Sequence, residues 1–419
     1  MVLLGALLAW QATVRTLASR YAQSDPVLAL RLSPDDPDAL SNLSGQLLVG
    51  KGRARSLGAA EAAALRAFEI APLQSEALRN LGLVADARGR QTRAMQIMAR
   101  ASRRGFRDVP TQAWLLQRAI LSGEFGPAFL RVDALLRTQP DLGSRLSPLI
   151  EALLNEPDAI EPFARTLATN PPWRRNALLY LSEKAQDVRP VIPIYPRLAQ
   201  LGRDPTTEEA QSILMRMVRD EQYEAAYRLW VSLLPDHGRS VPEQPYDGGF
   251  KGLPGSPPFN WDFVNQSGVT VHSARSDAPG GAALYLEYPV ANASLLARQM
   301  VVLPPGSYRL SGRMRVTRPA AGAGLVWSVT CAAPPEAVIA KARQRGDSST
   351  GWTSFVATFT APADCGVQWL SLDGLAGDGF GTLSAWVKDI SIQRLNSGAV
   401  AAATPPTGAS VVQGRGGQQ

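Results

Sequence analysis

The pattern of hydrophobic and polar positions changes character once along the chain, in the segment 246–263. Before this segment the sequence is rich in Ala, Leu and Arg, and apolar residues recur at helical spacing. After it, Val, Thr and aromatic residues alternate with polar ones at a period of two. The segment itself is crowded with Gly and Pro, which interrupt helices and mark turns. We therefore predict a helical region, a hinge, and an antiparallel β-sandwich, in that order.

The helical part contains an internal repeat. Residues 29–43 align without a gap with residues 67–81, and each segment ends one helix, turns at a proline and begins the next with an acidic first turn. Beyond them the offset settles at 34 residues, so that Gly89 corresponds to Gly123 and Ala94 to Ala128. With small residues inside the helices, this period resembles the tetratricopeptide repeat. The resemblance implies an α-helical solenoid over residues 23–240 that binds protein partners; an irregular helical bundle is the alternative.

Arginines form the densest charge cluster of the helical part. They would either bind an acidic partner or polyanion, or form a solvated helix face, and we favour the solvated face because charge runs usually have that role. The cluster consists of Arg88, Arg90, Arg93, Arg100, Arg103, Arg104 and Arg107.

The N-terminal run Met1–Val14 is apolar and is followed by Arg15. It is shorter than the ~20 residues that span a bilayer, and it lacks the basic residues that precede the apolar core of a signal peptide. A signal peptide, an anchor that begins upstream and a buried first helix all remain open. We favour an uncleaved anchor in residues 1–22, which would attach the protein to the inner membrane, facing the periplasm.

Short apolar and polar alternations separated by turn clusters predict eight or nine strands over residues 241–395. The clearest strand is Ser307–Thr317, with Tyr308, Leu310 and Met314 on one face and arginines on the other. The tail 396–419 lacks apolar periodicity, and we predict it to be disordered. The remaining strand-like runs are Val269–Arg275, Ala282–Val290, Leu295–Leu303, Leu325–Cys331, Trp352–Thr360, Cys365–Trp369 and Leu383–Arg394.

The two cysteines, Cys331 and Cys365, both follow the hinge. Each shares a predicted strand face with a tryptophan, Trp327 and Trp369 respectively, and we expect both indoles in the core. If the chain is exported, a Cys331–Cys365 disulfide packed against indole follows. Two buried free thiols are the alternative, and the apolar N-terminus favours the disulfide.

Several short motifs resemble the carbohydrate-binding-module-like (galactose-binding-like) jelly rolls. They are Gly248-Gly249-Phe250 before Phe259-Asn260-Trp261, Gln299 before Leu303-Pro-Pro-Gly306, and the closing run Ala385–Ile390. Joined to helical repeats, they resemble Gram-negative envelope proteins associated with exopolysaccharide production. The resemblance implies a scaffold that contacts glycan.

Modules of this shape often bind structural calcium through an acid after the opening Gly-Phe and an aspartate on the last strand. Asp389 is present, but Lys251 stands at the other position, so we expect no metal there. The formal charge of +7 comes without a Lys-rich tail or a basic-aromatic motif, which argues against nucleic acid as a partner. We expect no cofactor.

Enzyme signatures are missing: the sequence has neither a Gly-x-Ser-x-Gly elbow, nor a His-Glu-x-x-His motif, nor a phosphate loop. The acidic pairs Glu208-Glu209 and Asp220-Glu221 are expected to be exposed and solvated. We therefore predict a non-enzymatic protein. A glycan-active enzyme, such as a glycosidase built on two carboxylates from distant positions, is the rival hypothesis, and a pure protein–protein adaptor is the other alternative.

The outward face of the strand Ser307–Thr317 is the candidate site. Its arginines repel one another unless carboxylates or an anion lie between them, and an acidic polysaccharide would supply carboxylates. Cross-strand pairing with a carboxylate, for example Glu287 or Asp373, is the alternative, and the one we favour. Two tryptophans add surfaces on which sugar rings could stack. The candidate contacts are Arg309, Arg313, Arg315, Trp352 and Trp386.

Overall fold

The structure is a computed structural model of the chain. It describes residues 2–49, 53–235, 243–276, 281–333, 337–346, 348 and 351–395. The tail 396–419, predicted to be disordered, lies outside the described residues.

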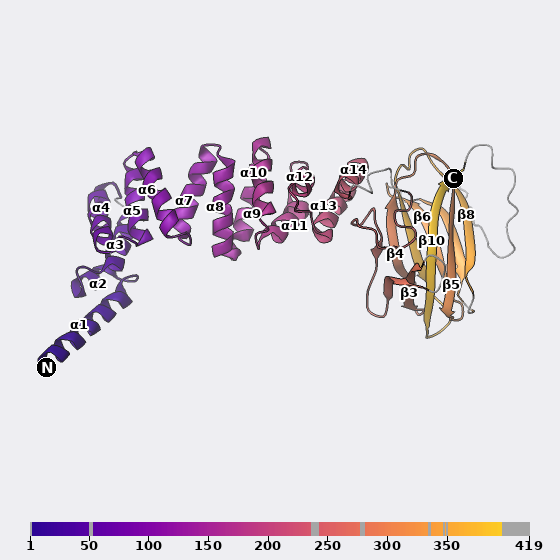
Figure 1. Ribbon diagram of the computed structural model, residues 1–419, viewed down its shortest axis with the longest axis horizontal. Coiled ribbons are helices and arrows are strands. Elements are labelled where there is room, and N and C mark those ends of the chain that lie inside the picture. The colour runs from indigo at the N-terminus through magenta and orange to yellow at the C-terminus, as the bar shows by residue number, and fades with distance from the viewer. Residues whose placement is uncertain are drawn as a thin grey trace, which may run out of the picture. The chain divides into compact units, whose positions relative to one another are not determined.

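Helices fill the first part of the chain (Figure 1). Their bounds are α1 Val2–Tyr21, α2 Pro26–Leu32, α3 Pro37–Val49, α4 Arg53–Ile70, α5 Ser75–Ala87, α6 Gln91–Arg104, α7 Val109–Leu121, α8 Phe125–Thr138, a 3₁₀ turn η1 Pro140–Leu142, α9 Gly143–Leu154, α10 Pro157–Ala168, α11 Arg174–Lys184, α12 Ile194–Gln200, α13 Thr207–Arg219 and α14 Tyr223–Leu233.

The predicted spacing is visible in the helix starts. Helix α7 begins 34 residues after α5, and α8 begins 34 residues after α6. Gly89 and Gly123, which follow α5 and α7, have φ values of 73° and 68°, a left-handed conformation that favours glycine. The alanines at corresponding positions, Ala94 and Ala128, are fully buried, so the paired helices approach closely.

The arginine cluster lies mainly on and beside helix α6. Arg90, Arg93 and Arg100 are exposed, while Arg88 pairs with Glu61 at 2.7 Å. This arrangement agrees with a solvated face.

The chain divides into two compact units, Met1–Ala177 and Leu178–Gln419. Helices α12 to α14 therefore belong to the same unit as the strands, whereas the sequence places the domain boundary at 240/241. An anchor is expected in residues 1–22, but no helix among the described residues is both long and apolar enough to cross a membrane.

The strands form two five-stranded antiparallel sheets, with orders β1-β4-β9-β6-β7 and β2-β3-β10-β5-β8. The predicted β-sandwich is confirmed. The strand bounds are β1 Asp262–Phe263, β2 Thr270–Arg275, β3 Ala282–Pro289, β4 Ser294–Val301, β5 Gly306–Arg318, β6 Gly324–Cys331, β7 Val338–Arg345, β8 Thr353–Ala361, β9 Gln368–Leu375 and β10 Thr382–Arg394.

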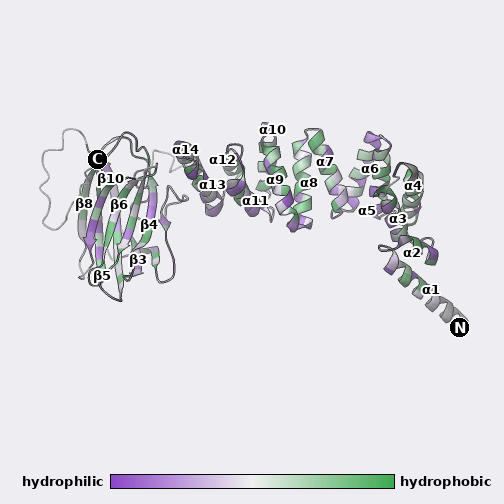
Figure 2. Cartoon of the chain, turned by 180° about the vertical axis from the view of Figure 1, so that it is seen from behind, coloured by the Kyte–Doolittle hydropathy of each residue, from purple (hydrophilic) through white to green (hydrophobic). Residues whose placement is uncertain are grey.

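Alternate side chains of both sheets meet in one apolar core, and Figure 2 shows hydrophobic and hydrophilic residues alternating along the strands. Trp327 of β6 lies 6.2 Å, ring to ring, from Phe355 of β8 on the opposite sheet. The hydroxyl of Tyr288 donates to the Gly324 carbonyl at 2.7 Å across the sandwich, and burial raises its pKa to about 12. The prediction of Trp327 as a core residue is confirmed.

Helix α14 packs on the sandwich through an aromatic cluster. Trp230 lies 5.0 Å from the ring of Tyr246 and 5.7 Å from that of Phe259, both in the hinge segment. The Tyr223 hydroxyl also donates to the carbonyl of Ala332, just after β6, at 3.2 Å. These contacts explain why the last helices and the strands form one unit.

Candidate functional site

A row of side chains crosses the outer face of the sheet β2-β3-β10-β5-β8. His272 pairs with Tyr285, Tyr285 with Trp386, and Trp386 with Arg315. Trp352, directly before β8, ends the row with its ring 5.3 Å from the Arg315 guanidinium carbon. Because neighbouring strands lie ~4.8 Å apart, the row spans about 19 Å. We call these five residues the aromatic row.

The row points outward because the alternate residues of the same strands lie in the core. Leu284 and Leu286 of β3 and Val387 of β10 are buried among core residues, whereas His272 is exposed and Trp386 is half-buried. The Tyr285 ring lies 5.1 Å from Trp386 and 5.4 Å from His272. The face thus offers three adjoining, partly exposed rings, with the Trp352 ring beyond Arg315.

Three cations surround the indole of Trp352. The charged groups of Arg313, Arg315 and Lys388 lie 5.8, 5.3 and 5.1 Å from the ring centroid. Such cation–π contacts are favourable, and more so where water is excluded. We call these four residues the Trp352 cluster. Arg313 and Arg315 are brought together as the sequence predicts, and Lys388 was missed.

Asp389 is the carboxylate that lies beside the cluster, 3.8 Å from Arg313 and 3.5 Å from the Lys388 amine. It sits where the β10–β5 register shifts, in a left-handed conformation with φ 56°.

Neither acid that the sequence analysis proposed as a pairing partner fills that role. Glu287 contacts Arg318 at 3.8 Å instead, and hydrogen bonds from Tyr285 and Ser384 hold its pKa below the usual range. Asp373 is on β9, in the other sheet. Cross-strand pairing, the alternative that we favoured, does occur at Arg313, but its partner is Asp389 of the neighbouring strand β10 and not either of the two acids given as examples.

The fifth candidate, Arg309, lies apart from the cluster. It pairs in register with Gln393 and Thr358, and four residues of strand place it roughly 13 Å from Arg313.

Trp369 was predicted wrongly as a core residue. It is half-buried and faces outward from β9, with the Arg298 guanidinium carbon 5.0 Å from its ring, while Leu370 and Leu372 enter the core. The error arose because Cys365 precedes β9 in a turn, so the strand alternation does not extend back to it.

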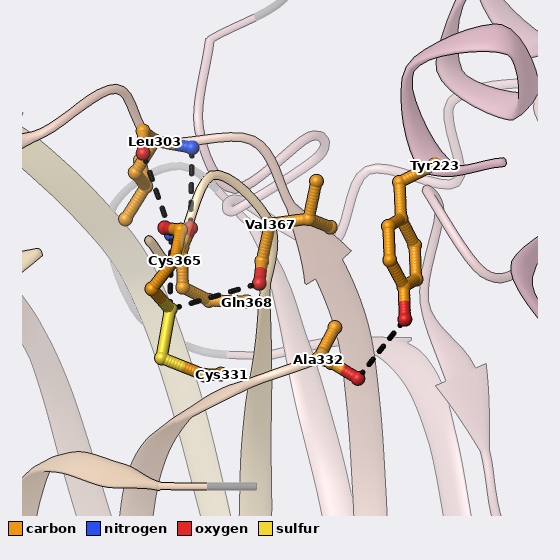
Figure 3. Close-up of a disulfide and its surroundings, with 7 residues drawn as sticks. All are labelled: Tyr223, Leu303, Cys331, Ala332, Cys365, Val367 and Gln368. Atoms are coloured by element: carbon orange, nitrogen blue, oxygen red, sulfur yellow. Dashed lines mark hydrogen bonds between the residues drawn. A yellow bond between two sulfur atoms is a disulfide. The ribbon is translucent and has the colours of Figure 1, made fainter. Parts of the chain in front are cut away.

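The disulfide joins the end of β6 to the turn before β9 (Figure 3). Cys331 and Cys365 have Cα atoms 5.5 Å apart, and the predicted pairing is confirmed. The amide of buried Gln368 lies beside it, donating to the Cys365 carbonyl and bonding the backbone of Leu303. The disulfide therefore closes one end of the sandwich.

The residues at the expected calcium position do not fit a calcium site. Lys251 supplies a positive charge, and Asp389 is already paired with two cations. Within the described ranges, no group of three or more His, Cys, Asp or Glu residues could hold a metal ion.

The acidic pairs of the helical part have structural contacts. Glu209 is buried, contrary to the prediction, because its carboxylate accepts the Thr206 N–H at 2.9 Å in a capping box. Asp220 accepts a hydrogen bond from Arg216 at 2.8 Å.

Comparisons with known proteins give distant likenesses only. No family model matches the chain, and neither does any curated protein. Similar solved structures include TmCBM61 in complex with β-1,4-galactotriose, with 15% identity over 35% of this chain and 92% of that one, at a TM-score of 0.25.

Two further examples are comparable. The CBM22-1 xylan-binding domain of Paenibacillus barcinonensis Xyn10C has 15% identity over 33% of this chain and 86% of that one, at a TM-score of 0.26. A family 16 carbohydrate-binding module has 17% identity over 35% of this chain and 94% of that one, at a TM-score of 0.24. Likenesses at such low scores identify neither a ligand nor an activity.

Proposed function

We propose that this chain is a non-enzymatic scaffold of the cell envelope whose β-sandwich binds an acidic polysaccharide. The glycan would lie along the aromatic row, with its carboxylates at the Trp352 cluster. The helical part would bind protein partners. The N-terminal residues would attach the chain to the inner membrane, with the rest of the protein in the periplasm. Assembly or export of an exopolysaccharide is the process in which we expect the protein to act.

The observation that carries this proposal is that aromatic rings and cations share one row across the sheet. Aromatic faces pack against the apolar C–H surfaces of sugar rings, as they pack against other apolar groups. Arg315 belongs to both the row and the cluster, and a guanidinium can bind a carboxylate through two parallel hydrogen bonds. The same strip therefore offers contacts for the rings and for the acidic groups of one chain.

Charge repulsion strengthens the case for an acidic ligand. Three cations lie within 6 Å of one ring centroid and repel one another, and the single carboxylate of Asp389 offsets only part of their charge. A bound carboxylate would reduce this repulsion, which gives an acidic glycan an advantage over a neutral one of the same length.

The test compares oligogalacturonate with a neutral oligogalactose of equal length, by calorimetric titration of the full chain. Arg313→Ser combined with Arg315→Ser should weaken oligogalacturonate binding about a hundredfold or more, because two charge-assisted hydrogen bonds are lost and each is worth about 1.5–3 kcal/mol. The melting temperature should change little, since both side chains lie outside the core.

The matched control is Arg309→Ser combined with Arg275→Ser, which removes the same charge from exposed positions of the same sheet. We expect it to bind like the unaltered chain. Equal weakening in both double variants would reduce the effect to net charge and overturn the site. Shortening of the glycan during incubation would overturn the non-enzymatic part of the proposal.

A further inference from the structure

A cavity of about 800 Å³ lies beside the second half of β10. Strand β3 pairs with β10 only as far as Val387. Beyond that point residues 244–248, where the chain enters the hinge segment, lie along β10: the Ile390 and Ile392 amides donate to the carbonyls of Gly248 and Gln244, each at 2.9 Å. The cavity lies between this segment and the strand and is partly open to solvent.

Asp389 connects the cavity to the sheet-face site. It lines the cavity and also contacts Arg313 and Lys388 of the Trp352 cluster. A ligand in the cavity would therefore adjoin a glycan bound on the aromatic row.

The polar lining offers both donors and acceptors. Glu243, Lys251, Ser391 and Gln393 line the cavity, and their side chains make no hydrogen bond to another of the described residues. A carboxylate only accepts, an ammonium only donates, and hydroxyl and amide groups do both. Asp247, by contrast, is satisfied locally, because its carboxylate accepts the backbone N–H groups of residues 251, 252 and 253.

We infer that this cavity binds a neutral sugar unit. The ligand is rich in hydroxyl groups, because a hydroxyl can pair with both the donors and the acceptors of the lining. The volume of the cavity lies within the ~300–1,000 Å³ that is usual for small-molecule sites. The ligand is uncharged because, even with Asp389 paired to Arg313 and Lys388, the carboxylates of Glu243 and Asp247 outnumber the single ammonium of the lining, Lys251, and so disfavour an acid. This inference extends the proposed function, on which it rests, to a second subsite for a neutral branch or end of the same glycan.

In the experiment, galactose, glucose and mannose are added separately to the full chain. Binding of each sugar is measured by saturation-transfer NMR, as the signal transferred from the protein to the sugar. Ser391→Trp should fill the cavity and abolish the signal, and Lys251→Ala should weaken binding about tenfold through the loss of one charged hydrogen bond. Thr360→Trp, at an exposed position of β8, is the matched control and should bind normally. Should Ser391→Trp fail to fold, Lys251→Ala, in an exposed loop, decides the question.

Oligogalacturonate binding, measured on the same variants, separates the two proposals. It should be unchanged within about twofold. If none of the three sugars binds the unaltered chain, or if both cavity variants bind them normally, the cavity assignment is overturned. If sugar binding is lost in the variants while oligogalacturonate binds no form of the chain, the cavity assignment stands and the acidic sheet-face site fails.

Discussion

Lys388 shows how a charged residue is accommodated on a sheet surface. It is 1% exposed, although its register with Arg313 places it on the outer face of the sheet. Its amine lies over the Trp352 ring and 3.5 Å from Asp389. The ring and the carboxylate together offset part of the cost of removing the ammonium from water.

Asp373 makes the stability of the sandwich depend on pH. Burial raises the pKa of this carboxyl above its usual range, and Lys341 partly opposes the shift. The folded chain thus holds the proton more tightly than the unfolded chain, so the ionised carboxylate costs stability above the folded-state pKa. That cost disappears as the pH falls below the unfolded-state pKa.

Asp373→Asn should therefore raise the melting temperature at neutral pH and have little effect at about pH 3, where Asp373 itself is protonated. Thermal denaturation at both pH values measures this. Asp262→Asn is the control, and it should lower the melting temperature at neutral pH. The reason is that the Asp262 carboxylate forms an ion pair with Arg298 at 3.1 Å, which the substitution removes. A lower melting temperature for Asp373→Asn at neutral pH would contradict the assignment.

At the scale of elements, the hinge and β10 approach closely because of one glycine. A Cβ atom on Gly248 would collide with the carbonyl oxygen of Ile390. The Gly248 carbonyl accepts the Ile390 N–H at 2.9 Å, which fixes the hinge against the strand. The first position of the motif Gly248-Gly249-Phe250 therefore requires glycine, because any side chain there would collide with β10.

Gly248→Ala should destabilise the unit that contains the sandwich by about 1–3 kcal/mol, the usual cost of overpacking a site that cannot expand. Chemical denaturation followed by tryptophan fluorescence would measure it. Gly366→Ala is the matched control, since a Cβ there meets nothing within 4 Å. Equal stability of the two variants would show that the hinge is not held against β10.

At the scale of the whole molecule, the helices nearest the hinge fold with the sandwich. The contacts of Trp230 with Tyr246 and Phe259 join α14 to the segment that opens the β region. Pro235, just after α14, also lines the cavity beside β10. A ligand bound in that cavity would therefore contact the chain directly after this helix.

Trp230→Ala should cost about 3–5 kcal/mol, as expected for truncating a buried aromatic residue, because Trp230 is 1% exposed. Calorimetry of the full chain should show the unit Leu178–Gln419 unfolding at a lower temperature. Trp10→Ala, at a residue that is 69% exposed in the other unit, should leave that transition unchanged. If Trp230→Ala unfolds like the unaltered chain, α14 is not part of the cooperative unit.

The order of helices and strands, and the residues of β5 that face outward, could be predicted from the sequence. Both follow from local periodicity, because successive side chains of a strand alternate between its faces. The disulfide was favoured on other grounds, the apolar N-terminus and the presence of two cysteines after the hinge. Strand β7 was not predicted, because most residues of its sequence, Val-Ile-Ala-Lys-Ala-Arg-Gln-Arg, favour helices.

The identity of neighbouring strands, and therefore of the side chains that meet, follows from tertiary packing and not from local pattern. Lys388 reaches Trp352, and Tyr285 reaches Trp386, through pairings between segments distant in sequence. The same long-range packing turned Trp369 outward and buried Glu209. Periodicity specifies the face on which a side chain lies, but the partners on that face depend on strand order and register, which the fold as a whole selects.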